Sequence, residues 1–372
     1  MAQILTPASP EELAEALAAC TQSVRLEGAA SKRRMGGPIA PAEIEISTSC
    51  LRRVLQYEPN DLTISAEAGL PWHELTALLA EHRQMIPLDP AFAEQATVGG
   101  VVATNSSGPR RRLYGTARDL IIGMKFVTLE GKIVQSGGMV VKNVAGLDMA
   151  KLLIGSFGTL AAVAVVNFKL VPMPEGTRTF VHRFASLDDA IMARDGVLQS
   201  VLQPSAIDLV NPTAARQLQL EPEWTLLIQA GGSSVVLDRY ARELPAAEAT
   251  EGEPEKTLWT AIREFTPQWL DANPNGLVAR LSTTLDRVAH AVRNWNGPVI
   301  SRAGTGVTYG YMAQAQEFVL AAKGVVEFAP DDFRTRNVLW PGTGSDFQMM
   351  KRVKDLFDPK HLLNKGRLYG RI

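Results

Sequence analysis

Residues 96–123 read ATVGGVVATNSSGPRRRLYGTARDLIIG, and this stretch sets glycines, short hydroxyl side chains and three consecutive arginines between two apolar runs. Glycine lets the backbone approach a ligand closely, and hydroxyl groups supply hydrogen bonds. Gly108 and Pro109 then turn the chain. We interpret 96–123 as a loop that cradles a ligand. An ordinary surface loop is the alternative, because glycine and serine are common in loops of every kind.

The composition of the whole chain narrows the class of protein. A length of 372 residues exceeds the roughly 100–200 residues of one domain, so we expect two domains. The 38 basic and 39 acidic residues give none of the excess positive charge that nucleic-acid binding needs. No apolar run reaches the roughly 18 residues that span a bilayer, and Pro7, Pro10 and Glu11 do not suit a signal sequence. We therefore expect a cytoplasmic protein with no transmembrane segment and no nucleic-acid partner.

Cysteines and histidines are too few and too scattered for a predicted metal centre. The two cysteines, Cys20 and Cys50, cannot ligate an iron–sulfur cluster within this chain. The histidines stand at 73, 82, 182, 290 and 361, without the short spacings of zinc ligands. The sequence therefore predicts no metal site.

Periodicity predicts an α+β fold. In the N-terminal half we expect helices over 9–19, 51–55 and 71–84, and strands over 63–67 and 161–170, with a hairpin formed by 121–129 and 132–135. Pro172 and Pro174 mark the end of this domain.

Beyond residue 175, strands alternate with helices in a pattern typical of a ferredoxin-like domain with an antiparallel or mixed sheet and helices on one face. The expected strands are 180–184, 206–210, 224–230, 277–281 and 299–301, and the expected helices are 186–202, 234–244 and 284–294. A last helix through Phe357 and a tail follow. We predict domains at 1–174 and 175–340, with 341–372 packing back on the first.

A second candidate ligand turn lies at 27–34, EGAASKRR. Backbone amides exposed by small residues beside Lys32, Arg33 and Arg34 can bind a phosphate. Three spaced glycines before a helix are missing, which argues against a nicotinamide-binding Rossmann site.

Six motifs in one order carry a resemblance to a known family. They are the turn at Gly28, TVGGVVATNSSG (97–108), Tyr114-Gly115 with Arg118-Asp119, KNVAGLD (142–148), GSFGTL (155–160) and FDPKHLLNKGRLYG (357–370). Together they resemble the FAD-binding family typified by vanillyl-alcohol oxidase, the PCMH-type family. Within it, GPRRRLYG followed by KNVAGLD is most similar to the FAD-binding E subunits of bacterial glycolate oxidases.

The resemblance implies a PCMH-type FAD-binding domain, an α+β cap domain, and FAD bound between them. In the family, the first turn holds the pyrophosphate, the second loop lines the diphosphate, ribityl and flavin region, and the strand after GSFGTL contacts the adenine side. Carried over to this chain, the expected FAD-binding residues are Gly28, Ala29, Ala30, Ser31, Lys32, Thr97, Gly99, Gly100, Ala103, Thr104, Asn105, Ser107, Gly108, Gly115, Asp119, Gly158 and Val163. The first turn has no histidine or cysteine, so we expect FAD to be non-covalent.

The sequence departs from the family pattern at several positions. Ala29 and Ala30 stand where glycines are common, and Phe157 stands where an acidic residue is often found. The cap has no histidine-rich cluster like that of the catalytic relatives. Catalytic residues therefore stay unassigned. Residues considered for a substrate carboxylate are Arg302, Arg334 and Arg336, and for a base Tyr309 and His361, with a structural role as the alternative for each.

The resemblance further implies a role in oxidising glycolate, a 2-hydroxy acid, to glyoxylate. The implied partners are a catalytic FAD subunit and an iron–sulfur subunit. In such a complex this chain would assist electron transfer or assembly, and its partners would hold it at the periphery of the inner membrane. A self-sufficient FAD-dependent dehydrogenase of glycolate or D-lactate is the alternative, and a subunit that has lost FAD is a third. We interpret Arg110, Arg111 and Arg112 as a subunit contact rather than as phosphate ligands.

Overall fold

The computed structural model describes residues 2–38, 40–140, 147–244, 247–293, 295–316, 324–340, 344, 346–370 and 372. The chain divides into two compact units. Unit 1 comprises Met1–Ser107, Thr116–Met173 and Gly342–Ile372, and unit 2 comprises Gly108–Gly115 and Pro174–Pro341. Residues 108–115, which we assigned to the first domain, thus group with unit 2.

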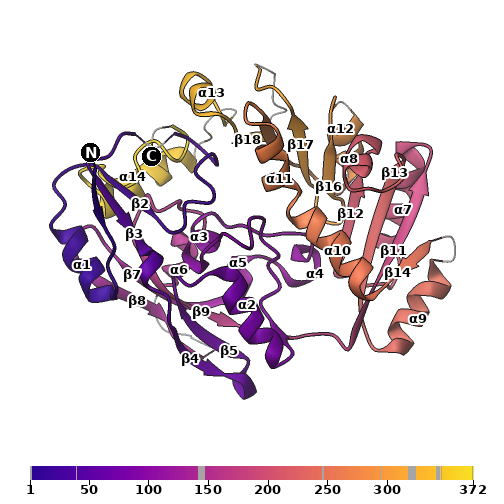
Figure 1. Cartoon of the computed structure of the whole chain (residues 1–372), viewed down its shortest axis with the longest axis horizontal. Helices are drawn as coiled ribbons and strands as arrows, with labels where there is room; N and C mark the ends of the chain where they lie inside the picture. The colour runs from indigo at the N-terminus through magenta and orange to yellow at the C-terminus, as the bar shows by residue number, and fades with distance from the viewer. Residues whose placement is uncertain are drawn as a thin grey trace. The chain divides into compact units, whose positions relative to one another are not determined.

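Unit 1 contains a small parallel sheet and a larger antiparallel one (Figure 1). The small sheet has the order β1-β3-β2, with β1 at Gln3–Leu5, β2 at Val24–Glu27 and β3 at Ile44–Ser47. The larger sheet has the order β4-β5-β9-β7-β8, with β4 at Val54–Glu58, β5 at Thr63–Glu67, β7 at Ile121–Val127, β8 at Ile133–Gly137 and β9 at Ala162–Lys169. A short pair joins β6 (Gln84–Met85) to β10 (Val171–Pro172).

Two predicted helices of unit 1 are confirmed. Helix α1 (Pro10–Ala18) begins after Ser9, whose hydroxyl accepts a hydrogen bond from the Glu12 amide, as expected of an N-cap. Helix α2 (Trp72–Glu81) buries Trp72, Leu75 and Leu79 at helical spacing in the main core of unit 1. Burial of these apolar side chains fixes α2 on the sheet.

The helix predicted over 51–55 is wrong. Thr48–Cys50 forms a single 3₁₀ turn, and the chain then enters the edge strand β4 at Val54. Leu55 in this strand is largely exposed. An edge strand that buries little gives a weak alternating pattern, which is why the sequence suggested a helix.

The interpretation of 96–123 as one loop is also wrong. The stretch contains three short helices: α3 (Val98–Ala103), α4 (Arg111–Tyr114) and α5 (Ala117–Leu120). Thr97 caps α3 by accepting a hydrogen bond from the Gly100 amide at 3.3 Å. Val98, Val101 and Val102 are buried, so the glycines lie on a short helix packed into the core.

Unit 2 is built on one antiparallel sheet in the order β14-β11-β13-β12-β16-β17-β15-β18. Its strands are β11 (Gly176–Phe184), β12 (Ala206–Val210), β13 (Trp224–Gly232), β14 (Glu248–Thr250), β15 (Leu277–Ser282), β16 (Val299–Arg302), β17 (Val307–Met312) and β18 (Gly324–Phe328). Its longer helices are α7 (Leu187–Gln199), α9 (Ser234–Glu243), α10 (Gly252–Arg263) and α11 (Phe265–Ala272), and its shorter ones are α8 (Pro212–Gln217), α12 (Val288–Arg293) and α13 (Asp331–Arg336). The predicted α+β class is confirmed.

Helices cover both faces of this sheet, so the expectation of helices on one face is wrong. Residues of α7, α9 and α12 share a core with Phe180 of β11. Glu255 of α10 instead bonds Thr177 and Thr179, which alternate with Phe180 along the strand and therefore point to the other face. Figure 1 shows α10 and α7 on opposite sides of β11 and β13.

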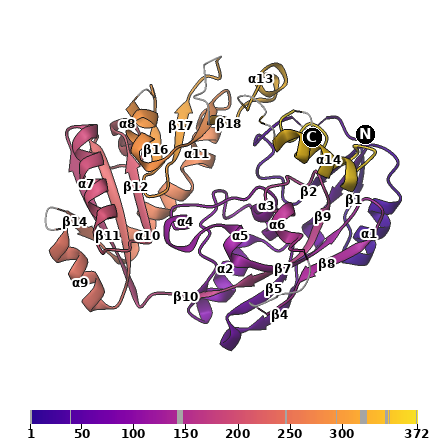
Figure 2. The same cartoon turned by 180° about the vertical axis from the view of Figure 1, so that it is seen from behind.

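The C-terminal segment returns to unit 1. Helix α14 (Asp346–Phe357) leads into a tail whose Leu363 forms an isolated parallel bridge with Val24 at the start of β2. Figure 2 shows this yellow segment beside the indigo N-terminal strands. The first and last parts of the chain therefore build one body.

Candidate cofactor-binding site

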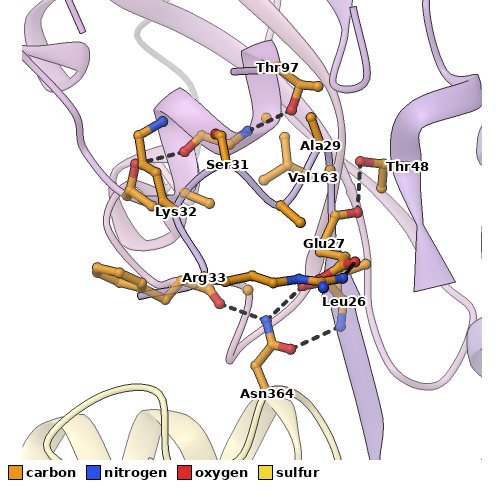
Figure 3. A pocket seen from close by; sticks show the side chains of 18 of the residues that line it. Leu26, Glu27, Ala29, Ser31, Lys32, Arg33, Thr48, Thr97, Val163 and Asn364 are labelled. Carbon is orange, nitrogen blue, oxygen red and sulfur yellow. Dashed lines mark hydrogen bonds and ion pairs between the residues drawn. The ribbon is translucent and has the colours of Figure 1, made fainter. Parts of the chain in front are cut away.

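One hollow in unit 1 collects most of the residues expected to bind a ligand (Figure 3). It encloses about 800 Å³ of empty space, part of it open to solvent. The expected residues that line it are Gly28, Ala29, Ala30, Ser31, Lys32, Thr97, Gly99, Gly100, Ala103, Thr104, Gly158 and Val163.

Other expected residues lie outside the lining of this hollow: Asn105, Ser107, Gly108, Gly115 and Asp119. The Asp119 carboxylate instead accepts hydrogen bonds from the amide and hydroxyl of Thr116 and so caps α5. Gly108 and Gly115 delimit the segment that groups with unit 2. Most of the KNVAGLD motif, residues 142–146, lies outside the described residues.

Several lining residues were not among our expected FAD-binding residues: Leu26, Glu27, Arg33, Thr48, Phe157, Ala161, Asn364 and Arg367. Leu26, Glu27 and Arg33 flank the first turn directly, and Phe157 and Ala161 flank Gly158, so extending the motifs by a few residues would have found them. Asn364 and Arg367 belong to the tail motif, which we quoted without assigning its side chains to the cofactor.

Close backbone packing explains two glycines of the hollow. A Cβ atom on Gly28 would lie 2.4 Å from Thr97 Oγ1, and one on Gly99 would lie 2.8 Å from the Cβ of Ala68. Such distances are far inside van der Waals contact, so a side chain at either position would displace its neighbour. Glycine at 28 lets the first turn lie against Thr97, and glycine at 99 lets α3 lie against Ala68.

Ala30 holds a conformation that favours glycine. Its φ angle is +56°, in the left-handed region, where an alanine side chain costs about 1–2 kcal/mol. The sequence departure at Ala30 therefore has a physical consequence, since the turn keeps the backbone path typical of glycine while carrying a methyl group.

Two cations lie at the first turn. Lys32 is 7% exposed, and its Nζ atom lies 5.4 Å from the centre of the Phe92 ring. Arg33 donates to Glu27 at 2.5 Å, and this hydrogen bond raises the pKa of Arg33. Hydroxyls of Ser31 and Thr97 and apolar groups of Ala103, Ala161 and Val163 complete the lining.

These residues fit FAD, which combines two phosphates with extended apolar rings. The Lys32 ammonium and the hydroxyls at the first turn suit the phosphates, whereas small apolar side chains suit a planar ring. The glycines at which a Cβ would collide keep the backbone close to the space that the cofactor needs.

The arginines considered for a substrate carboxylate lie in unit 2, and two of them are held by its own acids. Arg302 is buried and forms an ion pair with the fully buried Asp208. Its guanidinium also lies 5.7 Å from the centre of the Tyr309 ring. Arg334 is buried and pairs with Asp331, whereas Arg336 is exposed on the same short helix.

The two residues considered as bases lie in different units, Tyr309 in unit 2 and His361 in unit 1. Burial raises the pKa of the Tyr309 hydroxyl, and the nearby Glu327 raises it further. A phenol with a raised pKa keeps its proton at neutral pH and therefore cannot accept another group's proton. His361 Nε2 lies 2.8 Å from the Asp355 carboxylate on the surface of the C-terminal segment.

Of the three arginines at 110–112, Arg112 contacts other parts of unit 2. Arg112 is half-buried within unit 2, and its guanidinium donates to the Pro204 carbonyl at 3.0 Å. Its side chain also packs on Gly304, where an added Cβ would lie 2.7 Å away. Desolvation lowers the pKa of Arg112. Arg112 therefore has a structural role inside the cap, and the subunit contact stays a prediction for the three arginines.

The described part of the chain contains no group of three or more His, Cys, Asp or Glu side chains arranged to hold a metal ion. Its helices include none with the length and apolar character needed to cross a membrane.

Comparison with known proteins defines the class. Residues 1–137 match the family model of the FAD binding domain, and residues 342–368 match that of FAD linked oxidases, C-terminal domain. The chain is similar in fold to 4-ethylphenol oxidase from Gulosibacter chungangensis, with a TM-score of 0.70 and 13% identity over 99% of this chain and 89% of that one. It is thus a flavoprotein with the fold of an FAD-dependent oxidase.

Sequence relatives narrow the family. The chain is 32% identical to glycolate oxidase subunit GlcE of Escherichia coli K12, with 93% of each chain covered. It is 31% identical to the mitochondrial D-lactate dehydrogenase [cytochrome] of Arabidopsis thaliana over 58% of this chain and 38% of that relative. The chain belongs to the family of FAD-linked oxidoreductases that includes glycolate oxidase subunit GlcE. The resemblance found in the sequence is confirmed, and FAD is the cofactor.

Proposed function

We propose that this chain is the FAD-binding subunit of a glycolate oxidase complex, which oxidises glycolate to glyoxylate. The observation that carries the proposal is the 32% identity to a protein named as a glycolate oxidase subunit, extending over 93% of both chains. The alignment spans both units, so the likeness is not confined to the FAD-binding domain.

In this proposal, unit 1 holds FAD non-covalently in the hollow lined by the first turn, α3 and the 155–163 segment. FAD supplies the acceptor for the two electrons that leave the substrate. The chain's own residues bind and orient it: Lys32 and the first turn take the phosphates, and Val163 and Ala161 pack against apolar parts of the cofactor. The close contact of Gly28 with Thr97 keeps the backbone of the turn beside the cofactor.

The charges of the cap support an assisting role over independent turnover. A substrate carboxylate needs a cation, and a hydroxyl group that is to be oxidised needs a base. Asp208 already neutralises Arg302, Glu327 lies 2.9 Å from Arg280, and Tyr309 holds its proton. Releasing a buried arginine from its carboxylate would leave the acid buried without its partner, which is strongly unfavourable. We therefore assign substrate oxidation to a catalytic FAD subunit in the same complex.

The proposed partners follow from the electron path. Electrons that leave flavin one at a time commonly pass to an iron–sulfur cluster, and four cysteine thiolates usually hold such a cluster. This chain has two cysteines, of which Cys20 is buried and Cys50 exposed. We therefore propose an iron–sulfur subunit beside the catalytic subunit, in the cytoplasm or peripheral to the inner membrane through these partners.

Purification from the native host tests the proposal. The tagged chain should be yellow, should release FAD on denaturation, and should bring down a second flavoprotein and a cysteine-rich protein identified by mass spectrometry. Recovery of the flavin-loaded chain with neither partner would contradict the complex.

A self-sufficient dehydrogenase of glycolate or D-lactate is the second candidate. The observation in its favour is the 31% identity to a D-lactate dehydrogenase, although the alignment covers 38% of that relative. Reduction of the flavin by D-lactate or glycolate in the isolated chain would establish it.

A further inference from the structure

The C-terminal tail is anchored to unit 1 by a buried lysine. Lys354 of α14 is 1% exposed, and its ammonium donates to the carbonyls of Thr159 at 2.7 Å and Leu363 at 3.0 Å. It also pairs with the fully buried Asp358 at 2.6 Å. The Asp358 carboxylate accepts the amides of Leu362 and Leu363 in turn. This network ties the tail to the GSFGTL turn, which lines the cofactor hollow at Phe157 and Gly158.

Asn364 joins two walls of the hollow (Figure 3). Its amide group accepts a hydrogen bond from the Leu26 amide at 2.9 Å and donates to the Leu26 carbonyl at 3.0 Å. The same Nδ2 donates to the Phe157 carbonyl at 2.8 Å. Leu26 enters the first turn and Phe157 belongs to GSFGTL, so one buried side chain sets the spacing between the two segments.

Arg367 holds the far side of the first turn. Its guanidinium donates to the carbonyls of Lys32 at 2.7 Å, Arg33 at 2.8 Å and Gly37 at 3.2 Å. It is 6% exposed and lies 5.6 Å from the centre of the Phe157 ring. The rigid fork of an arginine can bond several carbonyls at once, which the single ammonium of a lysine cannot do in the same geometry. Arg367 therefore fixes the backbone path that follows the phosphate-binding turn.

We propose that Asn364 and Arg367 are positioning residues for the FAD site, so that docking of the tail and binding of FAD are coupled. The tail holds the first turn and the GSFGTL turn at the separation that FAD needs. The inference rests on the proposed placement of FAD in the hollow of unit 1. Coupling of this kind is reciprocal, because whatever the tail contributes to FAD binding, FAD contributes equally to tail docking.

Variants of the full-length chain test the first half of the proposal. Asn364 has a φ angle of +43°, which glycine adopts readily, so N364G permits the same backbone conformation and removes the whole side chain with its amide group. After removal and re-addition of FAD, we expect N364G and R367Q each to raise the dissociation constant for FAD about tenfold or more, because buried hydrogen bonds are lost. The dissociation constant of R367K for FAD should stay close to that of R367Q. R352Q, which removes the same charge from the exposed face of α14, should bind FAD like the wild type.

Two results would overturn the role of the guanidinium fork. Wild-type affinity in R367Q would show that the contacts do not matter to the cofactor. Wild-type affinity for FAD in R367K would show that a positive charge at position 367 is sufficient and that the guanidinium does not act by positioning the turn. The FAD-induced rise in unfolding temperature is measured beside the affinity, and it should shrink in N364G and R367Q even where the FAD-free protein unfolds at the wild-type temperature.

Hydrogen exchange in the unaltered chain tests the reciprocal half and needs no variant. Gly37 and Ala40 donate their amides to the Arg367 and Lys365 carbonyls, and Asn364 donates to Val24. FAD should slow exchange at these three amides. Exchange that FAD leaves unchanged at all three would contradict the coupling.

A further variant separates this inference from the placement of FAD. G28A sets a methyl group against Thr97 within the hollow and should weaken FAD binding whatever the tail does. If G28A binds FAD like the wild type, the placement itself fails. If G28A loses affinity while N364G and R367Q keep it, only the coupling fails.

Discussion

The cations that line the hollow of unit 1 and the arginines considered for a substrate in unit 2 are held in different ways. In unit 1, Lys32 and Arg367 line a hollow, and the guanidinium of Arg367 donates to backbone carbonyls. In unit 2, Arg302 and Arg334 pair with side-chain carboxylates of the same unit. A cation held by backbone dipoles keeps its positive potential for a ligand, whereas a cation beside a carboxylate has lost most of it. Unit 1 is therefore suited to an anionic cofactor, and the described charges of unit 2 serve mainly its own stability.

The largest effect is expected at the buried pair of Lys354 with Asp358 in unit 1. Lys354→Met leaves Asp358 buried without its partner and should lower the free energy of unfolding by about 4 kcal/mol. Lys351→Met on the exposed face of the same helix should change it by less than about 0.5 kcal/mol. The free energy of unfolding of both variants is measured by urea unfolding, with the release of flavin as the signal. Equal urea midpoints for the two variants would contradict a stabilising role of the Lys354–Asp358 pair.

Breaking the buried pair of Asp208 with Arg302 in unit 2 should lower the free energy of unfolding by a somewhat smaller amount. Asp208→Asn leaves Arg302 beside a neutral amide and the Tyr309 ring, so we expect a loss of about 3 kcal/mol. The exposed pair of Asp188 with Arg293 provides the control, because Asp188→Asn should cost no more than about 0.5 kcal/mol. Tryptophan fluorescence during urea unfolding reports the change.

The FAD content of the Asp208→Asn variant tests whether the buried pair in unit 2 also serves the cofactor. Asp208→Asn should retain the wild-type ratio of FAD to protein, because its partner Arg302 does not line the hollow. Loss of FAD in this variant without loss of stability would show that the cap pair serves the cofactor and would erase the difference between the units.

A smaller effect is expected at the first turn. Ala30→Gly relieves a left-handed alanine and should stabilise the protein by about 1 kcal/mol. Ala29→Gly is the matched control, and added backbone freedom should make it less stable by about 0.5–1 kcal/mol. The urea midpoints should move in opposite directions, and a shift of both in the same direction would contradict the strain at Ala30.

The smallest expected effect is on the pH dependence of stability, through His182 in unit 2. Burial lowers the pKa of His182 below its ordinary value of 6.5, so the folded state binds this proton less readily than the unfolded chain. The stability that neutral His182 contributes is fully present above its unfolded-state pKa of about 6.5, and it is lost as the pH falls from there through the lower pKa of the folded state. Between about pH 7 and about pH 5 the wild type should therefore lose more stability than His182→Gln. Parallel pH dependences of the unfolding midpoint would contradict this assignment.

The sequence predicted what local patterns encode. Strands β11, β12, β13, β15 and β16 and helices α1 and α2 have clear periods, and their positions agree with the structure to within a few residues, whereas β14, β17 and β18 were not predicted. Asp119 is instructive, because Thr116 and Asp119 have the spacing of a capping box, and that signal would have identified its structural role. The family motif pointed instead to the cofactor.

What the sequence could not show depends on contacts between distant segments. Asn364 and Leu26 are 338 residues apart, and Arg367 and Lys32 are 335 apart, so no local pattern links them. Burial of Lys354 and the pairing of Arg302 with Asp208 are likewise set by tertiary packing. The same holds for Ala30, whose left-handed conformation follows from the turn and not from alanine's own preference.

Anaerobic titration of the FAD-loaded chain with glycolate tests the contrast between the units most directly. We expect glycolate to leave the flavin spectrum of the isolated chain unchanged and to bleach it once the partner subunits are added. Bleaching of the isolated chain at the same glycolate concentrations would show that unit 2 binds and activates substrate, which would contradict the account.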